Sequence, residues 1–124
     1  MKTFYYKKLS TTRIAVLDIF QMSIDEVLEI CEQDIEVDET EQFHLISRIN
    51  VPREYRGQGI GTELLERVLE EADIEEVNLV LEILPFSDGP DYEVLHAWYS
   101  KHGFREMGPN GYFWRPHNPV EVEA

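Results

Sequence analysis

The sequence predicts a single α/β domain in which strands and helices alternate along the chain. Its 124 residues are 43% hydrophobic and 11% aromatic, which is enough for one core without metal or disulfide staples. A glycine-rich turn, RGQGIG at 56–61, joins a predicted strand to a predicted helix, and the nearly all-apolar stretch VNLVLEIL at 77–84 follows that helix. We expect one domain over residues 1–118 and a frayed tail at 119–124.

The first third of the chain predicts two strands and one short helix. Residues 4–8 and 13–20 are rich in β-branched and aromatic side chains, and the polar stretch between them suits a hairpin. A capping box at 23–26 precedes apolar residues at helical spacing, which predicts a helix from 24 to about 33. An acidic connector follows it.

The middle of the chain predicts strand, helix and strand. Residues 42–51 read as a long strand that ends at Pro52, which cannot donate to a ladder. The helix after the glycine-rich turn carries apolar residues on one face and acids on the other. The strand at 77–84 is apolar except for Asn78 and Glu82, as expected of a strand buried on both faces.

The last third predicts one helix and two short strands. Asp91 is a suitable N-cap for a helix over 92–102, which Gly103 terminates. Residues 104–107 and 112–115 flank the sequence GPNG, whose Asn-Gly pair favours a tight turn between two strands.

The glycine-rich turn predicts a phosphate-binding site. Gly57, Gly59 and Gly61 leave backbone N–H groups unshielded, and the following helix directs its positive N-terminal end at the same place. The turn is not a dinucleotide fingerprint, because Thr62 stands where the third glycine belongs. It is not a P-loop either, because no lysine follows Gly61.

Net charge excludes one class of partner. The formal charge is -14, and residues 14–47 carry ten acidic and no Lys or Arg side chains. Nucleic acid would be repelled, so we expect no nucleic-acid binding. Arg48, Arg53 and Arg56 form a small basic island beside the glycine-rich turn, as an anionic ligand requires, although surface arginines are also common without function.

The remaining composition predicts a cytoplasmic protein without metal. Cys31 is the only cysteine, so it cannot form an internal disulfide, and we place it in or near the core. The first residues lack the apolar region of a signal peptide, and no stretch is long enough to span a membrane. His96 and His102 lack a metal-ligand spacing, so we predict no metal site.

Two motifs resemble the GNAT acetyltransferase superfamily. RxxGxG, with Arg56, Gly59 and Gly61 after a strand, is similar to its acyl-coenzyme A pyrophosphate loop. LHAWYSKHGF at 95–104 is similar to its helix that ends in Tyr-x-x-x-Gly-Phe. The resemblance implies a three-layer fold with a central mixed, mostly antiparallel sheet and flanking helices. Members commonly carry two helices after the first strand, so the single short helix here implies an abbreviated N-terminal half.

The same resemblance implies that acetyl-coenzyme A binds where the strand before the glycine-rich turn splays from the strand at 77–84. The strand backbone would pair with the pantetheine arm and the turn would hold the pyrophosphate. Tyr92 stands where members often carry a cofactor-contacting asparagine, which is a departure from the pattern. The cofactor-binding residues so predicted are Ile49, Val51, Arg56, Gly57, Gln58, Gly59, Ile60, Gly61 and Thr62.

The resemblance further implies that Tyr99 is the general acid, protonating the departing thiolate; a phenol is neutral at pH 7 and can donate. Without the resemblance, Tyr99 would be interpreted as an aromatic residue of the core. For the general base, a carboxylate in an apolar strand makes Glu82 the first candidate, because burial would raise its pKa. A solvent-facing strand end is the alternative reading of Glu82. His44, Glu41 or a water chain are the other candidates for the base.

The predicted function is acetyl transfer to a primary amine of a cationic acceptor, either a small polyamine or aminoglycoside-like molecule or a protein lysine or N-terminus. Acidic residues at Asp88, Asp91 and Glu93, beside the predicted site, would concentrate such an acceptor. Two alternatives are an acidic interaction protein that mimics nucleic acid and an acyl-coenzyme A-binding protein without activity. The sequence leaves open whether the protein is a monomer or a homodimer.

Overall fold

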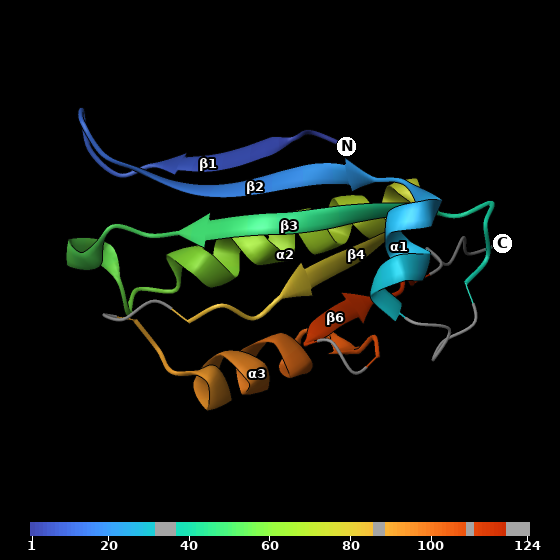
Figure 1. Ribbon diagram of the computed structural model, residues 1–124. Helices are drawn as coiled ribbons and strands as arrows, with labels where there is room; N and C mark the ends of the chain where they lie inside the picture. Colours follow the sequence, from blue (N-terminus) through green and yellow to red (C-terminus); the bar gives the residue numbers. More distant parts are fainter. Residues whose placement is uncertain (32–36, 86–88, 109–110, 119–124) are drawn as a thin grey trace, which may run out of the picture.

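The computed structural model describes residues 1–31, 37–85, 89–108 and 111–118, and these form a six-stranded sheet with helices on both faces (Figure 1). In chain order the elements are β1 (Phe4–Lys8), β2 (Ile14–Met22), α1 (Ile24–Cys31), β3 (Gln42–Asn50), the 3-10 helix η1 (Arg53–Tyr55), α2 (Ile60–Glu75), β4 (Val77–Glu82), α3 (Tyr92–Lys101), β5 (Arg105–Glu106) and β6 (Tyr112–Arg115).

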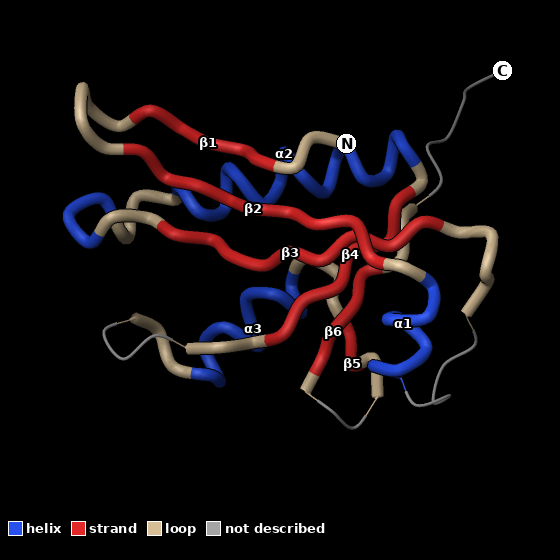
Figure 2. Tube along the Cα trace, turned by 45° about the horizontal axis from the view of Figure 1, so that its top comes forward, coloured by secondary structure: helices blue, strands red, loops and turns tan. Residues whose placement is uncertain are grey.

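The sheet is mixed and mostly antiparallel, as predicted. Its strand order is β1-β2-β3-β4-β6-β5, so the last strand lies between β4 and β5 (Figure 2). The pair of β3 and β4 is parallel, and the other four pairs of neighbours are antiparallel. The parallel pair requires a crossover, which α2 supplies.

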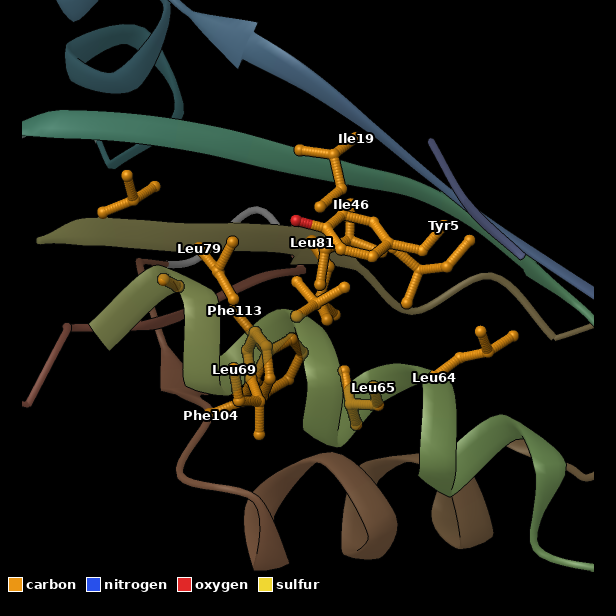
Figure 3. Packing of buried hydrophobic residues seen from close by; sticks show 14 of the residues in the cluster. Tyr5, Ile19, Ile46, Leu64, Leu65, Leu69, Leu79, Leu81, Phe104 and Phe113 are labelled. Atoms are coloured by element: carbon orange, nitrogen blue, oxygen red, sulfur yellow. The ribbon is translucent and has the colours of Figure 1, made fainter. Parts of the chain in front are cut away.

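Three layers result from two apolar clusters on opposite faces of the sheet. One cluster packs α2, with α3 at its margin, against the central strands (Figure 3). The other packs α1 against the opposite face, and Cys31 is buried in it as expected. Between β2 and β3 the described residues form only α1, which agrees with the abbreviated N-terminal half.

Local sequence signals explain where the helices begin and end. Ser23 and Glu26 exchange backbone and side-chain hydrogen bonds of 3.2 Å at the start of α1. The Asp91 carboxylate accepts from the backbone N–H of Val94 at 3.0 Å and caps α3. Gly103 follows with φ of 92°, the left-handed backbone that ends the helix.

The element boundaries differ from the sequence prediction in a few places. Strand β2 runs on to Met22, β4 ends at Glu82, and η1 was not predicted. The turn residues 109–110, the acid at 88, part of the connector and the tail after 118 lie outside the described residues, and the proposed domain limits stay a prediction. In the described part of the chain, no helix has the length and apolar character needed to cross a membrane.

A charged cluster fastens the end of the sheet to α2. Arg115 on β6 is buried and makes two bonds to Asp73 on α2, of 2.8 and 2.9 Å. The backbone N–H of Asn118 donates to the same carboxylate at 2.9 Å. Because two parallel bonds between a guanidinium and a carboxylate restrict their relative orientation, this contact helps to fix how β6 lies against the helix.

Candidate active site

The site begins where β3 and β4 separate. Their parallel pairing runs from Gln42 opposite Val77 to Leu45 opposite Val80 and then stops, although β3 continues to Asn50. Beyond that point the edge of β3 that faces β4 has no strand partner among the described residues. The predicted splay between these strands is therefore present, and it leaves backbone N–H and C=O groups for a ligand to pair with.

A groove of about 600 Å³ opens at this splay, and we call it the β3–β4 groove. Its walls come from β3, the glycine-rich turn, the first turn of α2, the end of β4 and one side of α3. The residues that line it include Ile46, Arg48, Ile49, Asn50, Val51, Tyr55, Arg56, Gly57, Gly59, Ile60, Gly61, Thr62, Leu81, Glu82, Leu84, Val94, Leu95, Trp98 and Tyr99.

The glycine turn, residues 56–61, presents backbone rather than side chains to this groove. Gly57 and Gly59 have φ of 80° and 77°, which favour glycine. Gly59 is the N-cap of α2 and supplies no side-chain cap, so the first N–H groups of the helix are left to an external acceptor. A Cβ built at Gly57 or Gly59 meets nothing within 4 Å. Open space before uncapped donors fits a pyrophosphate.

Gly61 differs from the other two glycines of the turn in its surroundings. Its φ is not positive, and a Cβ there would lie 3.7 Å from Val51 and 4.0 Å from Trp98, which are ordinary contacts. Gly61 lies in the first turn of α2 and lines the groove, and its role in cofactor binding stays a prediction.

Two predicted cofactor-binding residues, Arg56 and Gln58, differ from the rest in their surroundings. Arg56 lines the groove, and its Nε donates to the carbonyl oxygen of Val51 at 2.9 Å, so that this carbonyl already has a partner within the protein. Gln58 is exposed and does not line the groove. The other seven predicted residues also line it, and the roles of all nine stay a prediction. Within the basic island, Arg48 pairs with Asp18 at 2.8 Å.

Tyr99 faces the groove from α3. Its ring packs against Trp98 and Phe104, with centroid distances of 4.9 and 5.6 Å. Burial raises the pKa of Tyr99 to about 12. The phenol is therefore protonated throughout the physiological range and can donate its hydrogen to a group that gains negative charge.

Glu82 also reaches the groove, but the predicted burial of its carboxylate is wrong. It is the last residue of β4 and is exposed, so the solvent-facing strand end that we weighed as the alternative is what the structure has. Its neighbours Leu81 and Ile83 are buried in the cluster that packs against α2, so the alternation of a strand turns Glu82 to the opposite face. Glu82 is thus an accessible carboxylate in the groove that Tyr99 also lines.

The other candidate bases do not line the groove. His44 is buried on β3, and burial lowers its pKa; a smaller lowering comes from the positive N-terminus, and Glu75 opposes both. Glu41 precedes β3 and accepts from the Asn78 side chain at 2.7 Å. Both lie toward the start of β3, whereas the groove lies at its end. His102 donates from Nδ1 to the carbonyl oxygen of Trp98 at 2.8 Å, since a carbonyl can only accept.

Sequence reasoning missed the part that Trp98 plays in the groove wall. Its indole Nε1–H donates to the Thr62 hydroxyl at 3.1 Å and so joins α3 to α2. Leu95, Trp98 and Tyr99 are spaced i, i+3 and i+4, so the helical period placed all three on one face. That signal was available and could have identified the residue.

A sequence model of the acetyltransferase (GNAT) domain matches residues 13–106, which is more than half of the chain. The chain belongs to the GNAT acetyltransferase family. The match confirms the predicted family of this GNAT protein. It also confirms, as properties of that family, the predicted enzyme class of acyltransferase and acetyl-coenzyme A as the donor. No sequence among the curated proteins matches the chain.

Solved structures share the fold of this GNAT protein at low identity. PH1933 of Pyrococcus horikoshii OT3 aligns with a TM-score of 0.62 and 17% identity, over 89% of this chain and 62% of that one. The ribosomal-protein-S18-alanine N-acetyltransferase of Escherichia coli gives 0.60 and 18%, over 99% and 74%. The anti-CRISPR protein AcrVA5 gives 0.54 and 16%, over 91% and 98%. The chain thus spans less than two thirds of PH1933 and nearly all of AcrVA5.

Proposed function

We propose that the protein transfers the acetyl group of acetyl-coenzyme A to a primary amine of a cationic acceptor. One observation carries the proposal. The β3–β4 groove joins the uncapped N-terminus of α2, the unpaired edge of β3, the Tyr99 phenol and the Glu82 carboxylate. These are the parts that an acyl transfer needs, namely an anion cradle, a backbone edge, a proton donor and a proton acceptor.

Each part has a distinct role in the proposed reaction. The turn at 56–61 and the first residues of α2 hold the phosphates, and β3 from Ile46 to Asn50 pairs with the extended arm. The donor supplies a thioester carbonyl and a thiol leaving group. Glu82, directly or through water, takes a proton from the acceptor ammonium so that the amine can form the new C–N bond. Tyr99 gives its proton to the sulfur as the C–S bond breaks, and the second proton that the nitrogen loses on forming the amide returns to the Tyr99 phenolate through water.

Charge supports a cationic acceptor. The chain carries 25 acidic and 11 basic side chains, and Asp91 and Glu93 are exposed at the start of α3. Glu82 lines the groove, and Asp91 and Glu93 lie at the start of the helix that forms one of its walls. A field of this sign raises the local concentration of a cation, and salt weakens it over a screening length of about 8 Å at physiological strength.

The experiment is release of free thiol from acetyl-coenzyme A with a panel of acceptors, followed by mass spectrometry of the products. The panel contains spermidine, a lysine-rich peptide and a lysine-free peptide with an N-terminal alanine, since the E. coli enzyme is named for an alanine acceptor. We expect release with at least one cationic member. If the protein binds acetyl-coenzyme A but releases no thiol, the result would support an acyl-coenzyme A-binding protein without catalytic activity. If it does not bind acetyl-coenzyme A, the acidic interaction protein would be the remaining alternative.

Three variants connect the activity to the groove. Tyr99→Phe should lower kcat about 100-fold or more, with little change in affinity for acetyl-coenzyme A. Glu82→Gln should lower the rate at neutral pH and recover at higher pH, where the amine loses its proton unaided. Tyr92→Phe is the matched control, because Tyr92 lies on the same helix but does not line the groove. Equal effects at Tyr92 and Tyr99 would contradict the proposed role of Tyr99.

A further inference from the structure

Helix α3 is tied to the first turn of α2 through one side-chain hydrogen bond. The indole Nε1–H of Trp98 donates to the hydroxyl oxygen of Thr62 at 3.1 Å, and the bond is partly buried. Thr62 is the third residue of α2, next to the uncapped N–H groups. Both side chains line the β3–β4 groove, so the bond joins two of its walls.

The indole of Trp98 is held from several directions. The Tyr99 ring packs on it at 4.9 Å with an interplanar angle of 54°. The His102 ring meets it edge-on at 5.6 Å, and His102 also donates to its carbonyl oxygen. At Gly61 a Cβ would already touch the indole at 4.0 Å, so the ring lies against the backbone of α2. A side chain confined in this way transmits displacement instead of absorbing it.

We propose that Trp98 is a positioning residue that couples phosphate binding at the glycine turn to the placement of the Tyr99 phenol. This inference rests on the function proposed above. The Thr62 oxygen accepts from the indole, so its own hydrogen is left to donate to a phosphate oxygen. A hydroxyl that donates to an anion becomes a better acceptor, which strengthens its bond from Trp98. Phosphate, Thr62, Trp98 and Tyr99 then form one continuous chain of contacts.

The test uses ADP as the probe, because ADP carries a pyrophosphate but no pantetheine arm that could touch the phenol. The six tyrosines are replaced by 3-fluorotyrosine, and the Tyr99 resonance in the fluorine NMR spectrum is assigned by its loss in Tyr99→Phe. We expect ADP to shift the Tyr99 resonance of the otherwise unaltered protein. The shift should be lost in Thr62→Val, which keeps the shape and removes the hydroxyl, and in Trp98→Phe, which keeps an aromatic ring and removes the indole N–H.

A matched control separates this coupling from general damage to aromatic packing. Trp114→Phe changes the only other tryptophan, which packs on the opposite face of the sheet and does not line the groove. In Trp114→Phe the shift of the Tyr99 resonance with ADP should be kept. A shift that survives in Thr62→Val, or is absent from the unaltered protein although ADP binds, overturns the inference.

Calorimetric binding of ADP gives a second, independent readout. Thr62→Val should raise the Kd about 10-fold, the loss of one hydrogen bond to a charged group. Trp98→Phe should raise it by less, and the double variant should be no weaker than Thr62→Val, because both remove the same chain of contacts. If the losses of ADP affinity in the two single variants add up in the double variant, the coupling is overturned and the proposed function is unaffected. Absence of ADP binding to the unaltered protein refutes the phosphate site of the proposed function and the coupling with it.

Discussion

Substitution of Gly59 by alanine separates the cofactor site from the stability of the fold. Gly59 has φ of 77°, and a Cβ placed there meets no atom of the protein within 4 Å. The new methyl group therefore costs only the backbone strain of the left-handed region, about 1 kcal/mol, and the protein should fold. The methyl group also enters the open space before the donors of α2, where a pyrophosphate would have to lie.

The size of the effect follows from linkage. Acetyl-coenzyme A at about 100 times its Kd should stabilise the unaltered protein by about 2.7 kcal/mol. If the methyl group costs two charge-assisted hydrogen bonds of about 1.5 kcal/mol each, the Kd rises roughly 100-fold. The same ligand concentration then stabilises Gly59→Ala by only about 0.4 kcal/mol. In thermal unfolding, acetyl-coenzyme A should raise the Tm of the unaltered protein by roughly 10 °C and the Tm of Gly59→Ala by only about 1–2 °C.

Gly111→Ala is a closely matched control. Gly111 has φ of 80° and equally open space around a Cβ, but it does not line the groove. Both variants should lose about 1 kcal/mol without ligand, and only Gly59→Ala should lose the response to acetyl-coenzyme A. If both variants respond as the unaltered protein does, the glycine turn is not the phosphate site.

Two further predictions concern titration. Burial raises the pKa of Tyr99 to about 12. The difference in phenolate absorbance between the unaltered protein and Tyr99→Phe should therefore be absent near pH 10 and appear only about two pH units higher. A difference that appears near pH 10 would mean that the phenol is exposed. Burial alone would raise the pKa of Asp73, but hydrogen bonds from Arg115 and from the Asn118 backbone outweigh it, so the net pKa is lowered. A carboxylate whose pKa is lowered in the folded state stabilises the fold at neutral pH, and this stabilisation is lost as the pH falls below the usual Asp range. Asp73→Asn should therefore lower the free energy of unfolding by about 3 kcal/mol at pH 7 and by progressively less toward pH 3. Urea unfolding at both pH values measures this, and an equal cost at both would contradict the charged contact.

Elements whose signals are local could be predicted from the sequence. The capping box at 23–26, the Asp91 cap and the glycine turn each act within a few residues, and the structure has all three where the pattern placed them. The position of the groove could also be predicted, because the end of β3 and the turn are consecutive in the chain. The resemblance to the GNAT superfamily added the partner strand β4.

Features that depend on which segments meet could not be predicted. The sequence showed Glu82 as an acid in an apolar run, but whether it is buried depends on what covers its face of β4, opposite to the face that Leu81 and Ile83 present to α2. The bond between Trp98 and Thr62 joins residues 36 positions apart, and no local pattern encodes it. The same holds for Arg115 and Asp73, which are 42 positions apart and fix β6 against α2.

A chain with a net charge of -14 that is built to bind an anionic cofactor needs an explanation, and the architecture of the site supplies one. Backbone N–H groups at the start of α2 attract phosphate at contact distance, where a local dipole outweighs charges that lie a screening length away. Gly59 leaves those groups uncapped, so attraction to the cofactor does not depend on the net charge. The acidic side chains are therefore free to act at longer range, where their sign favours a cationic acceptor. Under the function proposed above the two substrates differ in charge, and one protein can serve both with backbone dipoles at contact distance and carboxylates at longer range.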